Sequence, residues 1–246
     1  MARGRARATF VARTLEELLG APPRARSRPR PLDMLVATLL SQNTNDRNSH
    51  RAWTNLRRRY PSWRAAAEAP VRSLEAAIRS GGMARTKARR IKRLLAAVHE
   101  RCEAYSLAPL RHLPDDRLMD ELMRIDGVGP KTAACVLLFS LGRDVFPVDT
   151  HIHRIAGRLA LVEGCRTPEQ TFAAMRALVP RGKAHSFHTN LIRFGRRVCR
   201  SARPLCGICP LAGACTWPGR TAYGGNGRGT AADHDFMLLD NVVRGR

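Results

Sequence analysis

The sequence predicts an all-α fold, and two observations support that prediction. Apolar residues recur at the three- and four-residue spacing of amphipathic helices along most of the chain, beginning with the strongly apolar segment from Leu32 to Leu40. No segment shows the alternation of apolar and polar residues that a half-buried strand requires. Breaks that contain proline or glycine separate the helical segments, as expected for helices joined by short loops.

The expected elements follow one another from the N-terminus. Residues 1–9 are rich in arginine and are expected to form a basic, disordered tail. A short helix over 10–19 stops at Gly20, and a connector rich in arginine and proline follows over 21–31. Residues 218–246 are expected to be a flexible tail, because a Gly-rich stretch lies near their start. After the helix at 32–40, further helices are expected over 50–60, 71–79, 86–103, 115–123, 132–141, 151–161, 168–178 and 184–194.

The charge of the chain points to a polyanionic partner. The 246 residues are enough for one large domain or two modest ones, and they carry a formal net charge of +23. Nucleic acid is the leading partner because neutralising phosphates releases counterions, and an anionic membrane surface is the second. No apolar run approaches the roughly 20 residues that a membrane span needs, and no signal-peptide core follows the basic N-terminus. We therefore expect a reduced cytoplasmic protein, associated with the nucleoid and not with a membrane.

Four cysteines near the C-terminal end form the spacing C-x6-C-x2-C-x5-C, at Cys199, Cys206, Cys209 and Cys215. In a reduced compartment, cysteines favour metal binding over disulfides. Four thiols this close along the chain can converge on one metal centre, and both a four-thiolate zinc site and a [4Fe–4S] cluster satisfy the spacing. The other three cysteines are isolated and are expected to be small buried hydrophobic residues: Cys102, Cys135 and Cys165.

A glycine turn lies between two of the expected helices, in the run Ile125-Asp-Gly-Val-Gly-Pro-Lys-Thr. Gly127 and Gly129 can both adopt positive φ, which lets successive backbone N–H groups point the same way and bind a phosphate oxygen. Pro130 marks the first position of the helix that follows, and Val128 is expected to plug the turn against the core. The alternative is a plain helix–helix turn without a ligand.

Lys131 follows this turn, and Asp149 lies farther along the chain in Val148-Asp-Thr-His. The positive end of a helix disfavours a cation, so the free amine of Lys131 is favoured there and can act as a nucleophile. The alternative for Lys131 is a simple contact with phosphate. Asp149 is expected either to be the N-cap of the next helix or to be a carboxylate that faces the lysine across a groove.

The glycine turn with Lys131, the run around Asp149 and the four cysteines resemble, in order and in spacing, the motifs of the endonuclease III family of DNA glycosylases. The resemblance covers about residues 31–215. It implies two helical domains with a DNA-binding cleft between them. A six-helix barrel with a helix–hairpin–helix is expected over 33–143. An iron–sulfur cluster domain is expected over 10–32 together with 144–217, with the four cysteines as ligands of a [4Fe–4S] cluster.

The resemblance also implies a mechanism. Lys131 falls on the family's catalytic lysine and Asp149 on its catalytic aspartate. A damaged base is flipped out of double-stranded DNA, Lys131 attacks the anomeric carbon, and Asp149 stabilises the developing positive charge. The imine that forms permits β-elimination, which cuts the strand 3′ to the lesion. The expected protein is thus a monomeric, bifunctional DNA glycosylase and AP lyase that excises oxidised pyrimidines.

The resemblance further identifies candidate DNA-binding residues. Asn43 lies where the family commonly has a glutamine that fills the gap left by the flipped base, with Gln42 beside it; the alternative is an amide-rich helix cap. Met83 takes the place of a leucine wedge, and the alternative is a Met83 that faces the core. Thr86 is expected to cap the next helix, and Lys87, Arg89 and Arg90 of that helix are expected to contact phosphate. The remaining candidates are the hairpin residues Gly127, Val128, Gly129 and Thr132, and Arg200 and Arg203 between the first two cysteines.

Two other functions are compatible with parts of this pattern. One is a glycosylase of the same superfamily that acts on mismatches or other lesions. Lys131 argues against the adenine-excising branch, because related glycosylases without lyase activity lack this lysine. The other is a non-catalytic DNA-binding protein with a metal staple, which leaves Lys131 and Asp149 unexplained.

Overall fold

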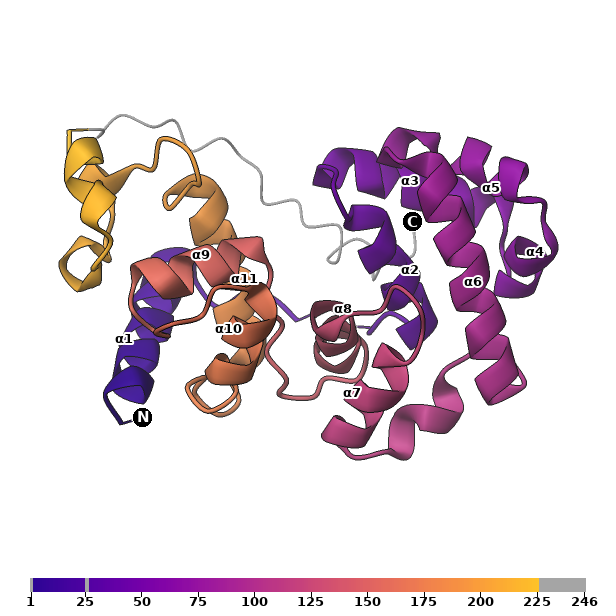
Figure 1. Ribbon diagram of the computed structural model, residues 1–246, viewed down its shortest axis with the longest axis horizontal. Helices are drawn as coiled ribbons and strands as arrows, with labels where there is room; N and C mark the ends of the chain where they lie inside the picture. The colour runs from indigo at the N-terminus through magenta and orange to yellow at the C-terminus, as the bar shows by residue number, and fades with distance from the viewer. Residues whose placement is uncertain (1, 25–26, 226–246) are drawn as a thin grey trace. The chain divides into compact units, whose positions relative to one another are not determined.

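The computed structural model describes residues 2–24 and 27–225, and within them the prediction of an all-α fold is confirmed, with helices and no strands (Figure 1). The described chain forms two compact units. One comprises residues 27–143, and the other combines residues 2–24 with 144–225. No helix in the described part of the chain is long and apolar enough to cross a membrane.

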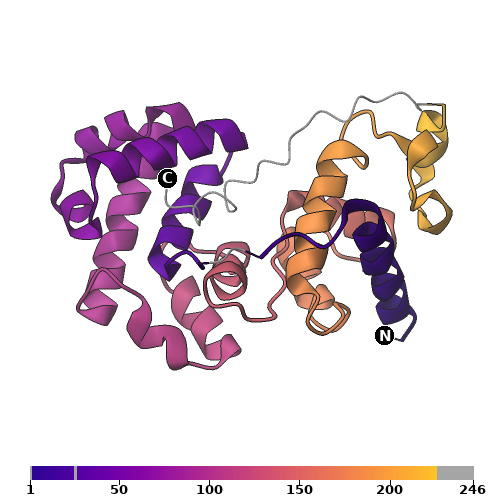
Figure 2. The same cartoon turned by 180° about the vertical axis from the view of Figure 1, so that it is seen from behind.

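The unit of residues 27–143 is built around α2 (Pro31–Ser41), in which eight residues are buried, among them Met34, Leu35 and Leu40 with no exposed surface. A helix that is apolar on all sides must be covered on all sides. The helices α3 (Asp46–Arg59), α6 (Ala84–Cys102) and α8 (Pro130–Cys135) all contact α2 (Figures 1 and 2). The remaining elements are α4 (Trp63–Glu68), α5 (Val71–Ala77), η1 (Arg79–Gly81), η2 (Ala108–His112), α7 (Asp115–Met123) and the π-helix η3 (Val136–Ser140).

The second unit joins the beginning of the chain to its last third. Helix α1 (Ala2–Leu19) packs against α11 (Ala184–Arg197), and α11 packs against α9 (Thr150–Arg158) (Figure 2). Phe187 and Phe194 of α11 are each 1% exposed and supply the largest side chains of this core. The other elements are α10 (Pro168–Met175) and the short helices η4 (Cys206–Ile208), η5 (Ala212–Ala214) and η6 (Pro218–Tyr223).

The predicted disorder of residues 1–9 is wrong for the described residues, because α1 begins at Ala2. Alanine and arginine are strong helix formers, and the apolar stripe of this helix extends into the expected tail. Ala8 and Val11 have no exposed surface, and the Arg5 guanidinium donates to the carbonyl of Ala177 at 3.2 Å. The basic segment is therefore ordered by contacts with a distant part of the chain.

Several predicted boundaries also differ from the structure. Helix α3 begins at Asp46, four residues before the expected start, because Asn45 caps it by accepting a hydrogen bond from the Asn48 N–H at 2.9 Å. Helix α6 begins at Ala84 with Met83 at the N-cap, so the prediction that Thr86 caps it is wrong. Of the expected C-terminal tail, residues 218–223 form η6, and residues 226–246 lie outside the described part of the chain.

Candidate active site and metal centre

The glycine turn joins α7 to α8 as the sequence predicts. The turn closes through a hydrogen bond from the Val128 N–H to the Ile125 carbonyl at 3.0 Å, and Val128 is 5% exposed, as expected of a plug. Gly127 has φ of +83°, the left-handed conformation that glycine adopts without strain. Gly129 instead has φ of −91° and serves as the N-cap of α8, so only Gly127 of the two uses the positive φ that glycine permits. No heavy atom lies within 4 Å of a Cβ added at either glycine, and a ligand can approach this backbone closely.

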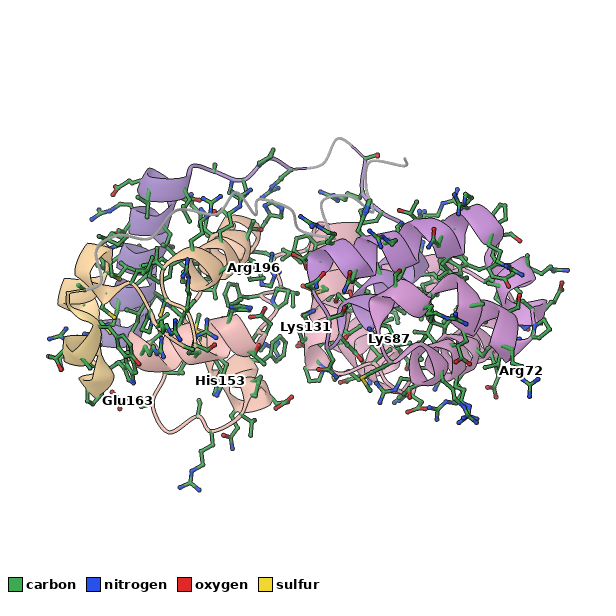
Figure 3. All side chains as sticks on the ribbon, turned by 90° about the horizontal axis from the view of Figure 1, so that it is seen from above. Arg72, Lys87, Lys131, His153, Glu163 and Arg196 are labelled. Carbon is green, nitrogen blue, oxygen red and sulfur yellow. The ribbon has the colours of Figure 1, made fainter. Side chains whose placement is uncertain are left out.

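Lys131 lies in the first turn of α8, directly after Pro130 (Figure 3). The first N–H groups of a helix have no partner within the helix, so this turn offers donors beside the lysine amine. The neighbouring Thr132 is 6% exposed and is therefore largely buried. Within the described residues of its own unit, Lys131 has no hydrogen-bond or ion-pair partner.

Asp149 caps α9 and belongs to the second unit. Its Oδ1 accepts a hydrogen bond from the Ile152 N–H at 2.8 Å, which confirms the prediction of an N-cap. The two residues before Asp149 are held in place. Val148 is 2% exposed, and Nδ1 of the buried His188 ring forms a hydrogen bond with the Pro147 carbonyl at 2.9 Å. The hydrogen bond to Oδ1 thus fixes the orientation of the Asp149 carboxylate.

The structure brings together the two loops that carry the predicted gap-filling residues, the one with Gln42 and Asn43 and the one with Met83, which we call the insertion loops. Asn43 and Met83 are both exposed and both left-handed, with φ of +52° and +49°, and the Asn43 amide donates to the Met83 sulfur at 3.8 Å. Gln42 accepts a hydrogen bond from the Arg90 guanidinium at 3.3 Å. Met83 is 53% exposed, so the alternative of a core-facing methionine is wrong.

Lys87 makes different contacts from those that the sequence interpretation assigned to it. The expectation that it contacts phosphate is wrong, because the side chain is 2% exposed. Its ammonium donates to the carbonyls of Leu40 at 2.8 Å and Gly81 at 2.7 Å, and burial lowers the pKa of Lys87. A signal was present: Lys87 falls on the apolar stripe of its helix, four residues before the buried Ile91.

The four predicted metal ligands line one pocket of the second unit. Apolar side chains from α11 and the loop after it form most of the remaining wall. Burial raises the pKa of the Cys209 thiol to about 11, and the other three thiols act in the same direction. The Arg158 guanidinium lies 3.4 Å from the Cys199 sulfur and stacks on Trp217, with 3.9 Å from its Cζ to the ring centroid.

These donors suit a thiolate-bound metal centre in kind and number. Thiolate is the form that binds metals, and the Arg158 cation favours it, whereas burial acts in the opposite direction and raises the pKa of Cys206 and Cys209. In the described residues, however, no group of three or more His, Cys, Asp or Glu side chains is arranged so that it could hold a metal ion. The four cysteines nevertheless share one pocket.

The two arginines between the first pair of cysteines lie on the loop that forms this pocket. Arg203 is exposed and left-handed, with φ of +49°, and Arg200 donates through Nε to the Arg196 carbonyl at 3.3 Å. The Arg200 carbonyl in turn accepts from Arg158 at 2.8 Å. These hydrogen bonds hold the loop against α9 and α11, and Arg203 faces solvent.

An all-α fold with a glycine hairpin that opens a lysine-bearing helix defines a class of DNA repair proteins. A family model described as "HhH-GPD superfamily base excision DNA repair protein" matches residues 36–181. The endonuclease III of Thermotoga maritima is 34% identical over 208 residues, which cover 85% of this chain and 93% of the relative.

Two solved structures are similar over nearly the same extent. A non-covalent endonuclease III–DNA complex has a TM-score of 0.74 at 26% identity, and a trapped endonuclease III–DNA covalent intermediate has 0.73 at 27%. Each covers 86% of this chain and 95% of the solved chain. The chain belongs to the endonuclease III family, within the HhH-GPD superfamily. It is accordingly an enzyme of the DNA glycosylase and AP lyase class.

Proposed function

We propose that this protein excises oxidised pyrimidines from double-stranded DNA and cleaves the strand 3′ to the abasic site by β-elimination. One observation supports the lyase step above all: the chain has only four lysines among 43 Lys and Arg residues. Three have structural partners, since Lys87 and Lys92 donate to backbone carbonyls and Lys183 pairs with Glu16. Lys131 is the fourth, at the start of α8 beside the hairpin, and only an amine can form the imine that the reaction needs.

In the proposed reaction, the unprotonated amine of Lys131 attacks the anomeric carbon of the flipped nucleotide as the glycosidic bond breaks and the base leaves with a proton. The carboxylate of Asp149 stabilises the positive charge that develops on the sugar. Ring opening gives an imine between Lys131 and the sugar. Loss of a proton from C2′ then breaks the bond between C3′ and its phosphate oxygen, and water hydrolyses the imine to release the enzyme.

The proposed DNA contacts divide by chemistry. Backbone N–H groups at Gly127, Gly129 and Thr132 bind a phosphate at the N-terminus of α8, with Val128 holding the turn. Arg200 and Arg203 add charge to a neighbouring stretch of backbone. Asn43 or Gln42, together with Met83, fills the space that the extruded nucleotide leaves.

The proposed cofactor is a [4Fe–4S] cluster held by the thiolates of Cys199, Cys206, Cys209 and Cys215. Bound there, it would serve as a structural staple for the loop that carries Arg200 and Arg203. The bond-breaking steps need only Lys131, Asp149 and water, so the proposed chemistry does not pass through the metal centre.

Borohydride trapping on duplex DNA with an abasic site tests the lyase step, because reduction makes the imine permanent. Wild-type protein should form a covalent adduct, and Lys131→Gln should form none while still binding the duplex. Lys92→Gln and Lys183→Gln are matched controls that should retain trapping. An adduct with Lys131→Gln, or none with wild type, would show that the proposed mechanism is incorrect.

A panel of lesion duplexes tests the substrate class. Base release and strand cleavage are scored separately for an oxidised pyrimidine, a mismatched thymine and an alkylated purine. We expect release and cleavage together on the oxidised pyrimidine. Preferred release of the mismatched thymine would support the mismatch-specific alternative, and binding without any release would support a non-catalytic protein.

A further inference from the structure

Lys87 is a buried cation whose two acceptors are the ends of two helical segments. Leu40 lies at the C-terminus of α2 and Gly81 at the C-terminus of η1, and the Lys87 ammonium bonds both carbonyls at 2.8 and 2.7 Å. Carbonyls at helix C-termini lack partners within the helix and carry partial negative charge. One ammonium therefore satisfies two groups that would otherwise be buried without a partner.

The two segments that Lys87 joins lead directly into the two insertion loops. Three residues after Leu40 comes Asn43, and two residues after Gly81 comes Met83. Both are non-glycine residues with positive φ, a conformation that persists only where the surroundings over-determine it. The conformations of both loops thus depend on the residues that pack against them.

One face of α6 provides that support. Lys87 and Arg90 are three residues apart and project on the same side of the helix, and Met83 is the N-cap that precedes its first turn. Each touches the end of α2 or the segment that follows it: Met83 accepts from Asn43, Lys87 donates to Leu40, and Arg90 donates to Gln42. Lys87 is the middle contact and the only one of the three that is buried.

We propose that Lys87 is a positioning residue that holds the Asn43 loop and the Met83 loop together as one rigid element for filling the gap in damaged DNA. This inference rests on the proposed function of the two loops. The two hydrogen bonds from Lys87 to the Leu40 and Gly81 carbonyls fix the relative position of the loops in the free protein. The loops therefore lose less conformational freedom when they enter the opened DNA.

The chemistry of the side chain fits this role. An ammonium has three donors on a compact head, whereas a guanidinium is planar and larger. The chain uses arginine at nearly all its basic positions, and it retains lysine where two carbonyls converge on one buried point. The backbone at Gly81 is closely covered as well, since a Cβ added there would lie 3.1 Å from the Ala52 Cβ and 4.0 Å from the Lys87 Nζ.

The test compares Lys87→Met with Lys92→Met in the full-length protein. Methionine is similar in length and apolar, so it removes the two bonds without burying a new polar group. Lys92 is the matched control: it lies on the same helix and also donates to two carbonyls, those of Ala67 and Ala69, but these precede α5 and not an insertion loop. Binding is measured to a duplex with a tetrahydrofuran abasic-site analogue and to the same duplex undamaged.

For Lys87→Met we expect the Kd for the abasic-analogue duplex to rise about tenfold, or about 1.4 kcal/mol. The Kd for undamaged duplex should stay near the wild-type value, because phosphate contacts dominate it. The single-turnover rate of strand cleavage at saturating enzyme should also be unchanged, because Lys131 is untouched. Lys92→Met should keep the wild-type ratio of the two Kd values.

An unchanged ratio in Lys87→Met would overturn the inference, and so would an equal loss in Lys92→Met, which would mark a general effect on stability. If Lys87→Met does not fold, Lys87→Gln, which retains donors but is one atom too short to reach both carbonyls, is measured in the same way. A wild-type protein without preference for the abasic-analogue duplex would instead overturn the proposed function itself, so the two failures are distinguishable.

Discussion

At the scale of single residues, Asp149 has two functions that substitution can separate. Its Oδ1 caps α9 by accepting from the Ile152 N–H, and its charge is proposed to stabilise the transition state. Asparagine is as good an N-cap as aspartate, because its side-chain oxygen accepts the same hydrogen bond. Asp149→Asn therefore removes the charge and keeps the cap.

We expect Asp149→Asn to bind abasic-analogue DNA normally and to lose at least about 100-fold in single-turnover base excision, the scale typical of a lost charge-stabilising group. Asp149→Ala should show the same loss and also be less stable by about 1 kcal/mol, the usual cost of a missing cap. Asp144→Asn is the matched control: its carboxylate accepts from the Gly182 and Ala184 N–H groups in the same unit. Unimpaired excision by Asp149→Asn would remove its proposed role.

The residues also differ in how far the sequence could predict them. Lys131 and Asp149 stand in short motifs, and the local structure of both is as predicted, because a proline at N1 and an aspartate at the N-cap are determined by neighbouring residues. The role of Lys87 could not be predicted in this way. Its two acceptors lie 47 and 6 residues away in the chain, and only the folded unit brings both carbonyls to one point.

At the scale of elements, α1 shows where sequence interpretation fails. A basic stretch at a chain end has the composition of a solvated tail. Helix α1 is stabilised by the burial of its apolar stripe of Ala8, Val11 and Leu15, which the local sequence does not reveal. The partner that buries it, α11, begins 165 residues after the end of α1. The helices of the other unit were easier to place, because they follow one another closely and are bounded by prolines and glycines.

The contact between α1 and α11 should make stability depend on pH through Glu16. A hydrogen bond from Lys183, 2.8 Å away, lowers the pKa of Glu16, and Ser186 adds to the effect. A carboxyl group with a lowered pKa stabilises the folded state fully above its unfolded pKa, about 4.3, and loses that contribution as the pH falls through the folded value. Because Lys183 is about half exposed, the contribution at pH 7 should be only about 0.5 kcal/mol.

Urea unfolding of Glu16→Gln should accordingly show a deficit of about 0.5 kcal/mol at pH 7 that disappears near pH 3. Glu17→Gln is the matched control, since Glu17 pairs only with Arg13 within α1 and both side chains are about two-thirds exposed. A deficit of the same size at both pH values would show that Glu16 acts through packing and not through its charge.

At the scale of the whole molecule, the proposed functions are divided between the two units. The unit of residues 27–143 carries the hairpin, Lys131 and both insertion loops, and the second unit carries Asp149 and the cysteine pocket. Spacing along the chain was enough to predict four cysteines that share one pocket. It could not distinguish zinc from an iron–sulfur cluster, because both accept four thiolates and the metal is chosen by properties that the spacing does not encode.

Removing one ligand tests the metal centre and its separation from the chemistry. Cys209→Ala should lose the absorbance near about 400 nm that iron–sulfur clusters share, together with about four iron atoms per chain. The loop that carries Arg200 and Arg203 should then lose its staple, so the affinity for duplex DNA should fall and the dependence of that affinity on salt should become weaker.

Cys165→Ala is the matched control for this variant, because Cys165 is half-buried in the same unit and lies outside the pocket, so it should retain iron and affinity. Cys209→Ala should still form the borohydride adduct at saturating DNA, because Lys131 belongs to the other unit and the proposed bond-breaking steps do not pass through the metal. Wild-type protein that is colourless and contains zinc would refute the iron–sulfur assignment. A Cys209→Ala variant that binds DNA normally but forms no adduct would mean that the metal centre takes part in the chemistry.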